Sequence, residues 1–152
     1  LEKYLDHWFD MKVQSPYMLL VSKVLKKHQI KTKKLINPID RINIPNSSIP
    51  AVTHVDYSSR IQTVDLNNNE RFYALINEFF KITGVPILLN TSFNMKDEPI
   101  VRLPEDAYRC FAMTDLDILV LGNYVINKPI SLPYYNKENS IYSINNEENE
   151  FK

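Results

Sequence analysis

A row of small hydrogen-bonding residues follows a short apolar run near the middle of the chain. Pro86 to Leu89 has the composition of a buried strand, and the segment Asn90 to Asn94 comes directly after it. Ligands of open α/β sheets bind beside the carboxyl ends of strands, and amides and hydroxyls suit a phosphate, carboxylate or carbamoyl group. A polar turn that merely ends a strand has the same pattern, so both interpretations stay open. The candidate binding residues are Asn90, Thr91, Ser92 and Asn94.

Arg60 is the second candidate for binding an anion. Its guanidinium is planar and permanently charged, so it can hold a phosphate through two hydrogen bonds. Ser58 and Ser59 precede it and add hydroxyl groups. A surface arginine at the end of a strand is the alternative interpretation.

The sequence offers no convincing pair of nucleophile and base. Ser92 has no histidine close to it and no GxSxG pattern around it. His54 and Asp56 are two residues apart on a predicted strand, so they share a face and are spaced for a hydrogen bond or a shared metal ion. A third metal ligand is not recognisable, so we predict no metal site and a histidine satisfied within the strand.

Composition excludes several classes of protein. The 152 residues include 18 basic and 18 acidic side chains, a balance that argues against a duplex-DNA binder. Only two glycines are present, too few for a Rossmann or Walker A loop. The single cysteine, Cys110, suits a reducing cytoplasm, and its apolar neighbours predict packing. No apolar run approaches the roughly 20 residues of a membrane helix, so we expect a cytoplasmic protein without a membrane partner.

Hydrophobic periodicity predicts a mixed α/β (α+β) fold with one twisted sheet flanked by helices. Helices are predicted over Leu1–Phe9, Glu70–Thr83 and Pro104–Met113. The predicted strands are Tyr17–Val24, Ala51–Asp56, Arg60–Asp65, Pro86–Leu89 and Asp117–Leu121.

Two segments look less regular. Leu25 to Pro50 is predicted as a long surface connection, and Lys23 to Lys34 has six lysines without an acidic residue. These lysines could contact phosphate or RNA, but a solvated charged surface is the preferred interpretation. Residues 129–152 are predicted to be a loosely packed or disordered tail, which leaves one domain over residues 1–128.

Four segments closely resemble the C-terminal domain of the NodU/CmcH-type O-carbamoyltransferases. They are SPYMLLVSKV (15–24), IPAVTHVDYSSRIQTV (49–64), FYALINEFFKITGVPILLNTSFNMKDEPIV (72–101) and PEDAYRCFAMTDLDILVLGNYVI (104–126). TSFN (91–94) also resembles the TSAN-type signature of the YrdC-like fold. The resemblance implies a YrdC-like domain with a mixed sheet.

In that family, the YrdC-like domain binds carbamoyl phosphate and ATP, here expected with Mg²⁺, and makes a carbamoyladenylate. An N-terminal domain with a bound metal ion then transfers the carbamoyl group to a hydroxyl acceptor. The resemblance implies that Arg60 and Ser92 are the catalytic residues, because they match the arginine of HVDxxxR and the serine of LNTSFN. Asn90, Thr91 and Asn94 would bind substrate beside them, and we expect Arg60 and this polar row to line one pocket.

The sequence departs from the family pattern in two places. A basic motif of the form K-x-R-E-x-[FW]-R-P usually precedes the segment that reads His7–Asp10 here, and it is not present. We therefore expect a fragment or truncated product that lacks the N-terminal transferase domain and is inactive in transfer alone. Tyr57 replaces a glycine of the family pattern. The alternatives are a YrdC-like nucleotide- or RNA-binding module and a non-catalytic remnant domain.

Overall fold

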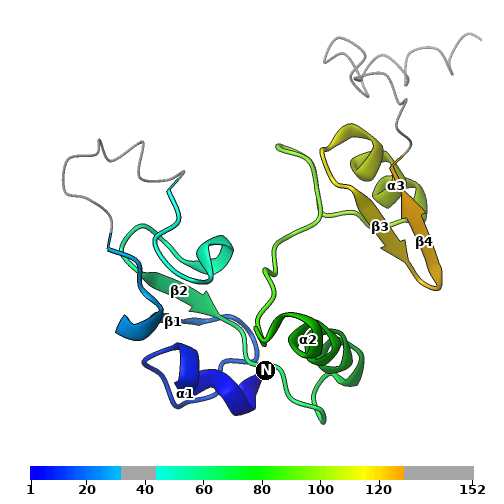
Figure 1. Ribbon diagram of the computed structural model, residues 1–152. Helices are drawn as coiled ribbons and strands as arrows, with labels where there is room; N and C mark the ends of the chain where they lie inside the picture. The colour runs from blue at the N-terminus through cyan, green and yellow to red at the C-terminus, as the bar shows by residue number, and fades with distance from the viewer. Residues whose placement is uncertain (32–43, 129–152) are drawn as a thin grey trace, which may run out of the picture. The chain divides into compact units, whose positions relative to one another are not determined.

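The computed structural model describes residues 1–31 and 44–128, which belong to two compact units (Figure 1). The first unit is Leu1–Asn90, and the second begins at Thr91. Each unit is described by itself below. In the described residues, no helix has the length and apolar character needed to cross a membrane.

The first unit pairs a short β-ribbon with helical segments. Strands β1 (Leu20–Lys23) and β2 (Ser58–Ile61) are antiparallel, with Val21 opposite Arg60 and Lys23 opposite Ser58. The helical elements in chain order are η1 (Glu2–Tyr4), α1 (Leu5–Trp8), η2 (Lys26–His28), η4 (Pro50–Val52) and α2 (Glu70–Thr83).

The core of the first unit lies between the start of the chain and the ribbon. Apolar side chains from α1, from the end of β1 and from β2 contribute to this core. Side chains alternate along β2, so Ile61 points into the core. Trp8, Val52, Val85 and Ile87 pack against this cluster. The buried members are Leu5, Phe9, Met11, Val24, Ile49 and Ile61.

Helix α2 has the bounds that periodicity predicts, Glu70–Thr83, because both of its ends carry local signals. The Asn69 side chain accepts a hydrogen bond from Phe72 N at 3.1 Å, which satisfies an otherwise unpaired N–H. Gly84 ends the helix at φ 74°, a left-handed conformation that glycine adopts without steric cost.

The second unit contains α3 (Pro104–Met113) and the antiparallel hairpin of β3 (Ile118–Leu121) and β4 (Tyr124–Asn127). Asp106 in the first turn of α3 accepts from Leu103 N at 3.1 Å, as expected for an acidic residue at a positive helix end. Ala107, Cys110, Phe111 and Leu119 are buried.

The structure confirms the mixed α/β class and corrects the predicted sheet. The described strands form two separate two-stranded antiparallel sheets, so the prediction of one shared sheet is wrong. Two of the predicted strands are present in shortened form, as β1 and β3, and the predicted strand over residues 60–65 begins two residues earlier and ends at Ile61, as β2. The other two, over residues 51–56 and 86–89, are wrong.

Residues 51–56 form the end of η4 and a turn, while residues 86–89 are extended without a pairing strand among the described residues. Pro86 is fully buried, and Val85 and Ile87 pack on the core, so the apolar pattern did report burial. The apolar pattern carries no information about a neighbouring strand, and a β-strand also requires such a hydrogen-bonding partner.

The ends of the predicted connection 25–50 are packed, not loose. Gln29 and Ser47 form an antiparallel bridge, and Ile30 N donates to Asn46 O at 2.7 Å. Ser47 and Ile49 are 1% and 6% exposed, so these two side chains are buried, while the other described residues of the connection are exposed or partly exposed. The middle of the connection, residues 32–43, and the predicted tail, residues 129–152, lie outside the described residues. The predicted domain boundary at residue 128 stays a prediction.

Candidate functional site

The turn before β2 carries the clearest polar cluster of the first unit. Tyr57 N donates to His54 O at 2.9 Å, and His54 N donates to Ser58 O at 2.7 Å, which closes a short loop. Tyr57 adopts φ 64°, the conformation that residues in such a bulged turn require and that glycine adopts most easily. This explains why a glycine occurs at this position in the family pattern. The backbone keeps the same turn with tyrosine.

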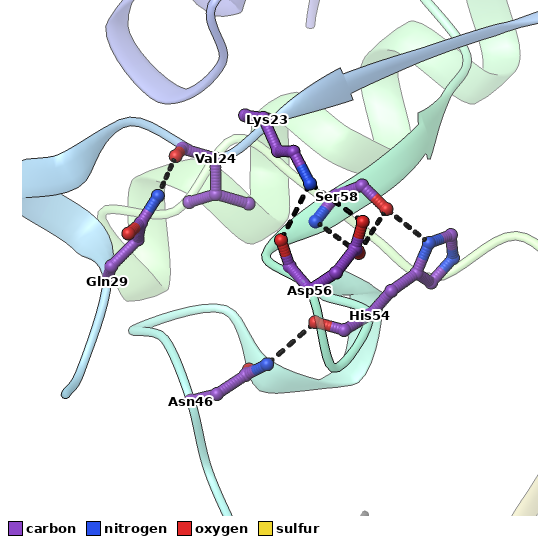
Figure 2. Close-up of polar contacts among 7 residues, drawn as sticks. All are labelled: Lys23, Val24, Gln29, Asn46, His54, Asp56 and Ser58. Carbon is purple, nitrogen blue, oxygen red and sulfur yellow. Dashed lines mark hydrogen bonds and ion pairs between the residues drawn. The ribbon is translucent and has the colours of Figure 1, made fainter. Parts of the chain in front are cut away.

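Four side chains at this turn are joined by hydrogen bonds (Figure 2). Ser58 Oγ donates to Asp56 Oδ1 at 2.6 Å and lies 2.9 Å from His54 Nδ1. Lys23 Nζ donates to Asp56 Oδ2 at 2.7 Å and to the Asp56 backbone oxygen at 2.8 Å. We call His54, Asp56, Ser58 and Lys23 the turn cluster.

The electrostatics of the turn cluster keep Asp56 ionised. The hydrogen bond from Lys23, followed by those from the hydroxyl and the N–H of Ser58, holds the pKa of the Asp56 carboxyl well below its usual range. Asp56 is solvent-exposed, so water screens the ion pair with Lys23. The carboxylate therefore acts as an acceptor that organises the turn.

Arg60 lies on the same face of the ribbon as Ser58, because side chains two residues apart in a strand point the same way. It is exposed, opposite the exposed Val21, whereas Ser59 and Ile61 on the other face are buried. Among the described residues it forms no ion pair. Its guanidinium is thus exposed, and its role in binding an anion stays a prediction.

Asn90 is linked to the strand that carries Arg60. Its amide nitrogen donates to Gln62 Oε1, two residues beyond Arg60, and Gln62 Nε2 donates to Pro16 O at 3.0 Å. The first residue of the polar row and the β2 segment are thus neighbours, although 28 positions separate Asn90 from Gln62 in the sequence. Sequence reasoning gave no indication of Gln62.

The remaining candidates belong to the second unit. Thr91 and Ser92 are exposed. Asn94 Nδ2 donates to Met95 O at 2.8 Å and to Glu98 O at 3.3 Å, so its amide nitrogen holds the loop that follows. Since the two units are described separately, the grouping of Arg60 with Thr91, Ser92 and Asn94 stays a prediction.

His54 and Asp56 interact differently from the sequence expectation. They lie in a turn, not a strand, and Ser58 connects them instead of a direct hydrogen bond. The Asp-x-Ser spacing was the missed signal, because an aspartate often accepts from the residue two positions later, as Asp56 does from Ser58 N at 3.0 Å.

The lysine-rich segment is only partly free to meet a ligand. Lys23 is bound by Asp56, while Lys26 and Lys27 are exposed on η2. His28 in the same turn stacks on Trp8 with ring centroids 4.1 Å apart. Lys33 and Lys34 lie outside the described residues. This segment therefore includes structural contacts as well as exposed charge.

Comparison with known proteins identifies the family. The family model described as "Carbamoyltransferase C-terminus" matches residues 1–128. The chain belongs to this carbamoyltransferase family. The resemblance drawn from the sequence segments is thereby confirmed.

Three relatives illustrate the range of this carbamoyltransferase family. An uncharacterized protein of Synechocystis sp. is 44% identical over 131 residues, which is 84% of this chain and 21% of that protein. The nodulation protein NolNO of Sinorhizobium fredii is 55% identical over 83 residues, 55% of this chain and 12% of the relative. The nodulation protein NolO of Bradyrhizobium diazoefficiens is 51% identical over 83 residues, 54% of this chain and 15% of the relative. The chain therefore spans about a fifth or less of the length of these relatives.

Proposed function

We propose that this chain supplies part of the carbamoyl phosphate and ATP site of an O-carbamoyltransferase, and that it helps to form a carbamoyladenylate. The family match over residues 1–128 supports carbamoyl transfer as the overall chemistry. ATP is proposed as a substrate with Mg²⁺ as its counter-ion, and the reaction is proposed to take place in the cytoplasm. Transfer to the hydroxyl acceptor is assigned to an N-terminal domain.

The observation that carries this proposal is the position of Arg60. It is an exposed guanidinium two residues after the buried Ser58 on β2, and it forms no ion pair with a carboxylate among the described residues. A fixed cation of this kind stabilises negative charge on a phosphoryl group, both in the bound substrate and as charge shifts during acyl transfer. Arg60 is therefore proposed as the residue that holds the phosphate of carbamoyl phosphate.

The polar row is proposed to supply neutral donors. Ser92 and Thr91 each carry one hydroxyl donor and are exposed, so they can bind a phosphoryl or carbamoyl oxygen without first breaking a buried contact. Asn90 is already ordered by Gln62, which reduces the conformational entropy lost when it binds. Asn94 is proposed to act mainly by shaping the loop.

Titration calorimetry tests the binding part of the proposal. The isolated chain should bind carbamoyl phosphate, and ATP with Mg²⁺, more tightly than inorganic sulfate at the same ionic strength. An assay with a hydroxyl acceptor should show no carbamoylation by the isolated chain. Binding of single-stranded RNA with a steep salt dependence, and of neither small substrate, would contradict the proposal and favour a nucleic-acid module.

A further inference from the structure

The turn cluster determines where the proton of the His54 imidazole lies. Ser58 Oγ lies 2.6 Å from Asp56 Oδ1 and 2.9 Å from His54 Nδ1, and a hydroxyl has one hydrogen to donate. Asp56, ionised beside Lys23, only accepts. The Ser58 hydrogen therefore goes to Asp56, and the bond between Ser58 and His54 must be donated by His54 Nδ1–H.

A neutral imidazole with its hydrogen on Nδ1 presents a lone pair at Nε2. Within residues 1–31 and 44–128, His54 Nε2 has no hydrogen-bond partner, and Figure 2 shows the dashed contact on one ring nitrogen only. Asn46 Nδ2 donates to His54 O at 2.7 Å and helps to fix the backbone that carries the ring. The cluster thus displays a fixed hydrogen-bond acceptor to solvent.

The His54 ring is linked to the strand that carries Arg60 through Ser58. Ser58, which holds the His54 ring, is two residues before Arg60, and the Cα atoms of such residues are about 6.6 Å apart in a strand. This part of the first unit therefore combines a cationic donor with a neutral acceptor. A ligand that suits both has an anionic end and an N–H end within a few bonds of each other.

Carbamoyl phosphate has this combination, since it joins a phosphoryl group to a carbamoyl NH₂. We propose that His54 Nε2 accepts a hydrogen bond from the carbamoyl NH₂ while Arg60 binds the phosphoryl oxygens, which makes His54 a specificity-determining residue. This inference rests on the proposed function. Acetyl phosphate has a methyl group in place of the NH₂, so it leaves the His54 acceptor unmatched.

Asp56 and Ser58 are positioning residues in this account. They touch the imidazole or each other, and they act on the ligand through the tautomer of His54. Asp56→Ala removes the acceptor of the Ser58 hydroxyl, which is then free to donate to Nδ1, and Ser58→Ala removes the bond to Nδ1. Both changes should move the imidazole hydrogen toward Nε2 and abolish the acceptor.

The first test reads the tautomer directly by long-range ¹H–¹⁵N NMR of the ¹⁵N-labelled chain at pH 8, where imidazoles are neutral. His54 should carry its hydrogen on Nδ1. His28 is an internal reference in the same spectrum, because its Nε2 lies 3.0 Å from the His7 carbonyl and must donate to it. Asp56→Ala and Ser58→Ala should shift His54 alone. A His54 hydrogen on Nε2 in the wild-type chain would overturn the inference.

The second test compares carbamoyl phosphate with acetyl phosphate by titration calorimetry. The wild-type chain should prefer carbamoyl phosphate by about tenfold, the value of one hydrogen bond. His54→Ala should remove the preference and keep the affinity for acetyl phosphate, whereas the control His7→Ala should retain the preference. Asp56→Ala, which keeps the imidazole, should also lower the ratio and serves if His54→Ala fails to fold.

The two levels of the proposal fail differently. Equal binding of the two acyl phosphates by the wild-type chain, or an unchanged ratio in both Asp56→Ala and His54→Ala, would contradict the role of His54 and leave the proposed function intact. Binding of neither acyl phosphate would contradict the proposed function and, with it, this inference.

Discussion

Lys23 Nζ lies 2.7 Å from Asp56 Oδ2 and 2.8 Å from the backbone oxygen of the same residue. A single ammonium group therefore joins the last residue of β1 to the turn that leads into β2. Both groups are exposed, so this contact contributes more to the geometry of the turn than to the stability of the fold. Protonation of the Asp56 carboxylate would break this ion pair, so we expect low pH to change the turn cluster through this contact.

Because the Asp56 carboxylate contributes to folding, we expect the stability of the chain to decrease at acidic pH. The pKa of this carboxyl is lowered in the folded chain, so its contribution to stability is complete above the unfolded value of 3.8 and is lost as the pH falls below it. The difference in free energy of unfolding between wild type and Asp56→Asn should therefore be constant from pH 6 to about pH 5 and shrink as the pH falls below 3.8. Urea denaturation at several pH values measures it. Asp10→Asn, which removes another exposed carboxylate of the same unit, is the control for the change in net charge.

At Tyr57 we expect the glycine variant to be more stable than the alanine variant, the reverse of the usual order. Glycine and alanine both remove the hydrogen bond from Tyr57 Oη to Ile30 O, so they differ only in how well they tolerate φ 64°. Tyr57→Gly should be more stable than Tyr57→Ala by about 1 kcal/mol. Chemical denaturation measures this. At Val55, where φ is not positive, the alanine variant should be the more stable one, and the same order at both sites would contradict the assignment.

The N-cap of α2 predicts a difference between neighbouring asparagines. Asn69→Ala removes the acceptor of Phe72 N and should cost about 1 kcal/mol of unfolding free energy. Asn67→Ala, in the same turn, keeps the Asn67 N–H that donates to Asp65 and should cost much less. Thermal unfolding followed by circular dichroism compares the two variants. Equal losses would show that the cap does not stabilise the helix.

We expect the thiol of Cys110 to react slowly with thiol reagents. The residue is 3% exposed in α3, and burial, with the nearby charge of Glu98, raises the pKa of its thiol. Because it is the single cysteine of the chain, one colorimetric thiol titration reports on it alone. The thiol should react at least tenfold more slowly in buffer than in denaturant. Equal rates would show that α3 does not protect it.

The helices were predictable from the sequence because their signals are local. Asn69 and Gly84 bracket the apolar periodicity of α2, and Pro104 begins α3 in the same way. The apolar run after Gly84 was correctly expected to be buried. Its assignment as a strand failed because hydrophobicity reports burial, whereas a strand needs a partner that only the folded chain supplies.

The candidate site itself stays a prediction. Arg60 was chosen from its chemistry, and the structure shows that it is exposed on β2. The turn cluster could not be predicted, because Lys23 reaches Asp56 across 33 positions of sequence. The contact of Asn90 with Gln62 spans 28 positions. The contact of Lys23 with Asp56 depends on the register of β1 with β2, and local sequence patterns encode neither pairing.

The affinity of the Arg60→Ala variant for carbamoyl phosphate tests the central claim most directly. Removing a charge-assisted hydrogen bond costs about 1.5–3 kcal/mol, so the dissociation constant measured by titration calorimetry should rise by one to two orders of magnitude. Arg71→Ala, which removes another exposed arginine of the same unit, should leave it unchanged. An Arg60→Ala chain that folds normally and binds carbamoyl phosphate as tightly as the wild type would contradict the account.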